Sequence, residues 1–241
     1  KKILDVLGLN ISFGENKQKT TVVHDIDFSL YENEILAIVG ESGSGKSVTS
    51  KAIMGLLQDK NTHIKGRINF EETSLLSLSS KEFAKLRGND IAMIFQEPMS
   101  ALNPSLTCGF QVAEILLHHK KVSASEVKKE VLQLFEKVKL PRPQDMYTSY
   151  PHQISGGQMQ RVVIAMAIAC KPKLLIADEP TTALDVTVQK EILQLLKDLQ
   201  KQTGMSMLFI SHDLALVCEL ADRVLVMYKG DIVEKGTVKE I

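Results

Sequence analysis

The apolar run from Ile35 to Val39 leads directly into a glycine-rich stretch, Gly40-Glu41-Ser42-Gly43-Ser44-Gly45-Lys46-Ser47-Val48. A short apolar run that ends at a glycine is typical of a buried strand, and the residues after Gly45 have a helical pattern. Glycines let the backbone curl until successive N–H groups point inward, and the helix that follows adds the positive end of its dipole. The stretch therefore predicts a phosphate-binding loop between a strand and a helix.

The polar side chains of this loop suit a nucleotide and its metal ion. We expect Lys46 to reach the β and γ phosphates and Ser47 to ligate magnesium. The rest of the loop, from Gly40 to Gly45 together with Val48, is expected to surround the phosphates. A chance match to this pattern in a chain of this length has a frequency of roughly 1%. The sequence therefore predicts a magnesium nucleotide site.

Two adjacent carboxylates end another apolar run. Leu174-Leu175-Ile176-Ala177 is followed by Asp178 and Glu179. Alone, such a pair is more often a solvated turn, but after a phosphate loop it predicts the second half of the same site. Asp178 is expected to hold the metal ion through water. Glu179 is placed to accept a proton from the attacking water, or to orient it.

Further strands and helices alternate along the chain. The runs Ile91 to Phe95 and Met207 to Ile210 also end in polar residues, and Val186 to Gln202 has a helical pattern. We therefore predict an α/β fold: a P-loop NTPase core with a mainly parallel sheet. Residues 1–34 are expected to form an antiparallel β subdomain, and about 98–165 an inserted α-helical subdomain. The chain is interpreted as one domain, 1–241, whose catalytic core comprises 1–97 and 166–241.

Composition excludes several classes of protein. The 29 basic and 29 acidic residues balance, so no global field attracts nucleic acid or an anionic membrane. Cys108, Cys170 and Cys218 lack any metal-ligand spacing, which indicates buried free thiols in a reducing compartment. No apolar run approaches the ~20 residues that span a bilayer, and no signal peptide is visible in a sequence that begins at Lys1. Any membrane-spanning part is expected to belong to other chains.

A further glycine pair identifies a family. Ile154-Ser155-Gly156-Gly157-Gln158, followed by Met159-Gln160-Arg161, resembles the signature sequence of ABC ATPases, with Ile in place of Leu. From the residues alone, Ser155 is a helix N-cap that Gln158 completes as a capping box. The resemblance implies that Ser155, Gly156, Gly157 and Gln158 contact the γ-phosphate of an ATP held by a partner subunit's phosphate loop.

The other positions of the family are filled in the expected order. Gln96 resembles the glutamine that senses magnesium and water, and Asp185, in Ala183-Leu184-Asp185, resembles the loop that crosses the dimer interface. His212 resembles the switch histidine that contacts the γ-phosphate. Phe13 lies where the family has an adenine-stacking ring, although a lone Phe near a strand is usually core. The resemblance implies ATP hydrolysis with Mg2+, in which the catalytic residues are Glu179, His212, Lys46 and Gln96, and the magnesium site comprises Ser47, Gln96 and Asp178.

Three segments resemble one branch of the family, the ATPases of oligopeptide, dipeptide and nickel importers. These are Glu97 to Pro104, Tyr150 to Gln153 and Ile164 to Ala167. Subunits of that branch usually continue into a cysteine-containing extension, whereas this sequence stops at Ile241. The branch implies a second, non-identical ABC ATPase subunit, two transmembrane permease subunits and, indirectly, an extracytoplasmic substrate-binding protein. It also implies a peripheral location on the cytoplasmic face of the membrane.

Several alternatives stay open from the sequence. The cargo is an oligopeptide or dipeptide, or else nickel or a metal complex within the same branch. An exporter or another importer branch would use the same ATPase unit. A soluble ABC ATPase that acts on nucleic acid or ribosomes is opposed by the neutral charge, so we expect no nucleic-acid partner. We do not expect His118-His119 to bind a metal ion, because no third ligand is near in the sequence. We interpret Ser125 to Lys139 as an ordinary amphipathic segment.

Overall fold

The computed structural model describes residues 1–15, 19–120 and 123–241. The chain forms two compact units, each with its own set of strands and helices. The first unit comprises residues 1–84 and 204–241, and the second comprises residues 85–203. The predicted boundaries of the catalytic core and the helical insert remain predictions.

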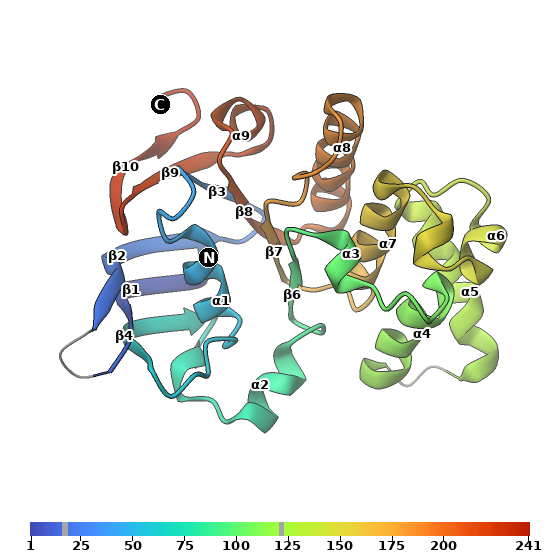
Figure 1. Cartoon of the computed structure of the whole chain (residues 1–241), viewed down its shortest axis with the longest axis horizontal. Helices are drawn as coiled ribbons and strands as arrows, with labels where there is room; N and C mark the ends of the chain where they lie inside the picture. Colours follow the sequence, from blue (N-terminus) through green and yellow to red (C-terminus); the bar gives the residue numbers. More distant parts are fainter. Residues whose placement is uncertain (16–18, 121–122) are drawn as a thin grey trace. The chain divides into compact units, whose positions relative to one another are not determined.

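The amino-terminal part of the first unit is an antiparallel sheet. Strand β1 (Lys2–Phe13) pairs with β2 (Thr20–Tyr31) on one side and β4 (Thr62–Phe70) on the other, and β4 continues to the short β5 (Thr73–Ser74) (Figure 1). Leu4 and Val6 are buried, and after a register shift the buried positions become Leu9 and Ile11. Gly8 lies at this shift with φ +58°, a conformation typical of a β-bulge. The antiparallel strands predicted within residues 1–34 are confirmed.

The remaining strands of the first unit are centred on β3 (Ile35–Val39). Strand β3 runs parallel to both β8 (Ser206–Ser211) and β9 (Arg223–Tyr228), and β10 (Asp231–Thr237) pairs antiparallel with β9. Every residue of β3 is buried, as expected for a central strand between parallel neighbours. The helices of this unit are α1 (Lys46–Ile53) and α9 (Leu214–Leu220), with the 3-10 turn η2 (Leu75–Ser77). The chain enters the second unit through α2 (Ser80–Leu86).

The second unit combines a parallel strand pair with a set of helices. Strand β6 (Ile91–Ile94) pairs in parallel with β7 (Leu174–Asp178), and Phe95 follows β6 rather than belonging to it. The intervening chain is helical, as predicted for residues 98–165 (Figure 1). Its elements are α3 (Pro98–Ala101), α4 (Cys108–His119), α5 (Ala124–Lys137), α6 (Pro143–Thr148), η3 (Pro151–Gln153) and α7 (Gly156–Ile168). Helix α8 (Val186–Thr203) completes the unit.

The helices of the second unit have a core of their own. Val127, Val131 and Phe135 repeat on one face of α5 and are buried, as is Val138 just beyond it, whereas Leu134 is half-buried. This spacing is the apolar stripe of a surface helix, so the prediction of ordinary amphipathic packing is confirmed. None of the helices in the described residues has the length and apolar character that crossing a bilayer requires.

The cysteines correct one prediction. All three are free thiols: Cys108 is buried and Cys170 is half-buried. Cys218 is exposed, so the expectation that every thiol is buried was wrong. The physical reason lies in the geometry of α9, which buries Val217 and Leu220 on one face. Cys218 falls outside that face.

Candidate nucleotide site

The phosphate loop begins where β3 ends, and its first glycine is required by a close backbone contact. Val39 pairs with Val226, so Gly40 lies beside Met227 of β9. A Cβ atom on Gly40 would lie 2.1 Å from the carbonyl O of Met227. Gly45 has φ +103° and is the N-cap of α1, a conformation that residues with a Cβ atom disfavour. The path of the loop therefore requires glycine at position 40. At position 45 any other residue would strain the backbone.

Lys46 points into the loop that precedes it. Its Nζ donates to the carbonyl O of Gly40 at 2.7 Å and to that of Glu41 at 2.8 Å, and Ser44 Oγ is 3.5 Å away. Lys46 is only 4% exposed, and the segment from Glu41 to Gly43 is exposed. A buried ammonium group that donates to neutral carbonyl oxygens is a strong attractor for an anion. The loop thus combines a fixed positive charge with an open rim.

The other predicted residues of the first unit lie at strand ends. His212 is exposed and directly follows β8. The next residue, Asp213, caps α9 by accepting from the N–H groups of Ala215 and Leu216. Phe13 is the half-buried last residue of β1. Ser47 and Val48 are half-buried in the first turn of α1, where their roles in nucleotide binding stay predictions.

The predicted acids and the predicted glutamine meet within the second unit. Asp178 is the buried last residue of β7, and Glu179 follows it with φ +47°. The Oε2 atom of Glu179 accepts a hydrogen bond from Gln96 Nε2 at 3.1 Å. It also accepts one from Thr182 Oγ1 at 2.9 Å. Two donors therefore fix the direction of the carboxylate that was predicted to act on water.

No sequence pattern indicated the contribution of Thr182. Its hydroxyl reaches Glu179 because the chain makes a tight turn, in which the N–H of Thr182 donates to the carbonyl O of Glu179 at 3.2 Å. The pattern Pro180-Thr181-Thr182 marks a turn but does not indicate which hydroxyl faces the carboxylate.

The signature residues and the predicted interface loop also lie together. Ser155 caps α7: its Oγ accepts from the N–H of Gln158 at 3.3 Å, while Gln158 Oε1 accepts from the N–H of Ser155 at 2.9 Å. The predicted capping box is confirmed. A Cβ atom on Gly156 would lie 3.5 Å from Leu184, and one on Gly157 would lie 2.8 Å from Val188. Asp185 accepts from the N–H of Val188 at 3.0 Å, so it holds the start of α8 beside the signature.

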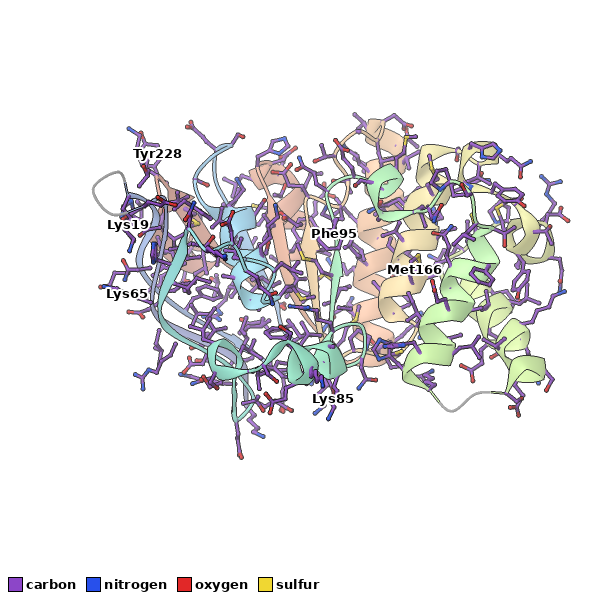
Figure 2. The ribbon with its side chains drawn as sticks, turned by 60° about the horizontal axis from the view of Figure 1, so that its bottom comes forward. Lys19, Lys65, Lys85, Phe95, Met166 and Tyr228 are labelled. Atoms are coloured by element: carbon purple, nitrogen blue, oxygen red, sulfur yellow. The ribbon has the colours of Figure 1, made fainter. Side chains whose placement is uncertain are left out.

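An apolar groove of about 510 Å3 lies in the second unit, and one of the residues that line it, Phe95, directly precedes Gln96 in the sequence. Phe95 and Met166, both labelled in Figure 2, are among its lining residues. Met99, which is 72% exposed, belongs to the short helix α3 whose residues Ser100 and Ala101 also line the groove. Met93, Ile115, Val163 and Ala167 complete the lining.

Magnesium prefers oxygen ligands, and each of the three predicted ligands carries an oxygen donor, while their assembly into one site stays a prediction. The hydroxyl of Ser47 and the carboxylate of Asp178 supply oxygens, and the amide of Gln96 supplies a third. No group of three or more His, Cys, Asp or Glu side chains gathers as a metal site in the part of the chain that the structure describes. The rings of His118 and His119 contact each other edge to face, with centroids 4.7 Å apart. Burial and the neighbouring His118 lower the pKa of His119.

A glycine-lined phosphate loop on a parallel strand, with a lysine inside it, defines a P-loop NTPase. A family model described as ABC transporter matches residues 23–182, and the chain belongs to this family. The dipeptide transport ATP-binding protein DppD of Bacillus subtilis (strain 168) is 52% identical over 100% of this chain and 72% of its own length. The oligopeptide transport ATP-binding protein OppD of the same organism is also 52% identical, over 100% of this chain and 67% of its own length.

A solved structure agrees with these relatives. The chain superposes with a TM-score of 0.86 on a dimeric ATP-binding cassette bound to ADP and Pi in a post-hydrolysis state. That cassette is 26% identical, and the match covers 98% of both chains. The predicted α/β fold class, the identification as an ABC ATPase and the resemblance to the peptide importer branch are confirmed.

Proposed function

We propose that this chain is the ATP-hydrolysing subunit of an ABC importer for dipeptides or oligopeptides. The observation that carries the hydrolytic role is the carboxylate of Glu179, whose Oε2 atom is held by Gln96 and Thr182. A carboxylate that is fixed at the end of a buried strand suits a water-activating group. The peptide cargo is inferred from the relatives, which are named as dipeptide and oligopeptide transport proteins.

ATP binding begins at the phosphate loop. The negative charge of the phosphates attracts the buried ammonium of Lys46, which exchanges its bonds to the carbonyls of Gly40 and Glu41 for stronger bonds to phosphate oxygens. The N–H groups at the start of α1 add donors, and the dipole of α1 adds positive potential. Phe13 stacks on the adenine ring. Ser47, Gln96 and Asp178 would hold a magnesium ion, which would supply positive charge to the phosphates.

Hydrolysis depends on one water molecule placed in line with the γ-phosphate. Glu179 accepts a hydrogen bond from this water, or takes its proton, through a carboxylate whose orientation Gln96 and Thr182 fix. His212, exposed at the end of β8, donates a hydrogen bond to the γ-phosphate. Lys46 stabilises the negative charge of the transition state.

A second, non-identical ATPase subunit completes each site. Ser155 is exposed at the start of α7, and the first N–H groups of a helix have no partner within the helix. This end of α7 contacts the γ-phosphate of an ATP that the partner subunit's loop holds. Asp185, beside the signature, crosses the same interface. ATP therefore closes the pair, and hydrolysis reopens it.

Two transmembrane permease subunits receive this movement on the cytoplasmic face of the membrane. The apolar groove lined by Phe95 and Met166 suits a short amphipathic helix of a permease. Gln96 directly follows Phe95. A movement of Gln96 when ATP is bound or hydrolysed is therefore passed to Phe95, which lines the groove. An extracytoplasmic substrate-binding protein delivers the peptide to the permeases.

Replacing Glu179 with Gln tests the hydrolytic role. The amide oxygen of Gln can still accept from Gln96 and Thr182, so we expect an intact fold and an ATP affinity within about twofold of wild type. The turnover number should fall by roughly 100- to 10,000-fold, because an amide cannot take a proton from water. Size-exclusion chromatography with ATP should detect a trapped closed pair. Glu191→Gln, in the same unit, is the matched control and should keep wild-type turnover; undiminished turnover of Glu179→Gln would refute the assignment.

Native purification tests the transport role. The full-length protein is tagged, extracted from its own membrane, and its copurifying chains are identified by mass spectrometry. We expect two multi-span permeases and a second, similar ATPase. In liposomes, a dipeptide or tetrapeptide with the binding protein should stimulate ATP hydrolysis, whereas nickel ions should not. Recovery with ribosomes or nucleic-acid enzymes would overturn the proposal.

A further inference from the structure

A buried glutamine in α7 contacts the turn that carries the proposed catalytic acid. The side chain of Gln160 is fully buried. Its Nε2 donates a hydrogen bond to the carbonyl O of Pro180 at 2.6 Å. Pro180 is the residue directly after Glu179. One side chain therefore connects the helix that begins at the signature with the backbone that positions Glu179.

Packing alone does not explain a glutamine at this position. Its Oε1 is buried and accepts no hydrogen bond from any residue among 1–15, 19–120 and 123–241. A buried acceptor without a partner is unfavourable, because it has lost its hydrogen bonds to water. A methionine would fill nearly the same volume without that cost. The hydrogen bond to Pro180 is the property that methionine lacks.

The turn needs support from outside because its backbone is strained. Glu179 has φ +47° and Ala183 has φ +69°, in the left-handed region that residues with a Cβ atom disfavour. Such conformations persist where the surroundings determine them. Gln189 of α8 donates to the carbonyl oxygens of Thr181 and Leu184, at 3.2 and 3.1 Å. Gln160 holds the other end of the turn, next to Glu179.

We propose that Gln160 is a positioning residue that makes the direction of the Glu179 carboxylate depend on the place of α7. The inference rests on the proposed function, in which an ATP on the partner subunit contacts the start of α7. Gln160 lies about one helical turn beyond Gly156, the first residue of that helix. A shift of α7 on contact with this ATP moves Pro180 through the short hydrogen bond. Contact of α7 with the ATP on the partner subunit thereby orients Glu179 for hydrolysis of the ATP that this subunit's own phosphate loop holds.

The first test replaces Gln160 with Met in the full-length protein, purified together with its copurifying chains. We expect kcat to fall about tenfold or more, because a displacement of ~1 Å at a reacting group can cost up to ~100-fold. The KM for ATP should stay within about twofold, because the phosphate loop is unchanged. Gln200→Met is the matched control: Gln200 is also a buried glutamine of the second unit, on α8. This control should keep wild-type kcat.

The second test uses Gln160→Glu and the pH. As a carboxylate, Glu has no hydrogen to donate to Pro180, whereas a protonated carboxyl group does. Burial raises the pKa of a glutamate, so protonation falls within the working range of the enzyme. The ratio of kcat for Gln160→Glu to kcat for wild type should therefore rise as the pH falls from about 8.5 to about 6.

The outcomes separate this inference from the function on which it rests. If Gln160→Met keeps kcat within twofold of wild type, or if the Gln160→Glu ratio is flat with pH, the positioning role is refuted while the ATPase assignment stands. If wild type does not hydrolyse ATP, or Glu179→Gln turns over normally, the proposed function is refuted, and the positioning role with it.

Discussion

Gly40→Ala is the substitution whose effect the structure defines most sharply. The new Cβ atom would lie 2.1 Å from the carbonyl O of Met227, 2.9 Å from Ser44 Oγ and 3.1 Å from the carbonyl C of Met227. The nearest of these atoms belongs to the backbone of β9, which pairs with β3 along Val39 and the residues before it. The backbone of β9 cannot rotate away, so the loop must move by about 1 Å to restore an ordinary contact distance.

The magnitude follows from this displacement. Inserting a methyl group into a packed site costs about 1–3 kcal/mol. For a chain of this length, 1 kcal/mol corresponds to about 2–4 °C, so a cost of about 2 kcal/mol lowers the melting temperature by roughly 4–8 °C. Nucleotide affinity falls as well, because a displaced loop no longer aims its N–H groups and Lys46 at the phosphates. We expect at least a tenfold loss of affinity for magnesium ATP.

Thermal melting and titration with a fluorescent ATP analogue measure both effects on the full-length protein. Gly8→Ala is the matched control, since Gly8 has φ +58° but the nearest atom among the described residues to a Cβ atom there would be Asp25 Oδ1, at 3.4 Å. It should lower the melting temperature by a few degrees, through backbone strain of about 1 kcal/mol, and leave nucleotide affinity unchanged. If Gly40→Ala melts and binds nucleotide like wild type, the steric argument is wrong.

Three further predictions concern other parts of the molecule. Thr182→Val removes the hydroxyl that donates to Glu179 at 2.9 Å, so kcat should fall about tenfold with KM for ATP unchanged, as steady-state kinetics will measure; equal kcat values would contradict the contact. At pH 8, iodoacetamide should modify exposed Cys218 first and Cys108 only after unfolding, because burial shields Cys108 and raises its pKa to about 11; mass spectrometry of digested protein gives the order. Gly156→Ala should keep or slightly raise the melting temperature, since its Cβ atom would meet Leu184 at an ordinary 3.5 Å, yet lower ATP turnover; normal turnover would argue against an anion site there.

The core strands β3, β6, β7 and β8 were predictable because each is marked twice in the sequence. A continuous apolar run such as Ile35 to Val39 reports burial on both faces, and the glycine after it reports the end of the strand. The same double mark sets the limits of β7, where the apolar run ends in Asp178. In β1 the alternation of buried positions changes phase at the Gly8 bulge, a feature that depends on pairing with β2 and β4. Local patterns do not encode such a register shift.

The site was predictable only as far as its residues belong to motifs. Gln96 and Glu179 were assigned separately from the sequence, and the structure adds that one donates directly to the other. Thr182 and Gln160 act through contacts with Glu179 and Pro180 that arise from the packing of α7 and the turn. The sequence around a threonine or a glutamine does not indicate which group its side chain will contact. The partner of Thr182 lies 3 positions away in the chain, and that of Gln160 lies 20 positions away.

The two interpretations of the signature, as a helix cap and as a phosphate contact, describe one arrangement. The capping box uses the N–H of Gln158, and the first bond within α7 uses that of Met159. The N–H groups of Gly156 and Gly157 precede any acceptor within the helix, so they can serve an acceptor outside it. Glycine at 157 also has a packing reason, because a Cβ atom there would lie 2.8 Å from Val188. Gly156 lacks such a neighbour, so an effect of Gly156→Ala on turnover measures the phosphate contact without the packing.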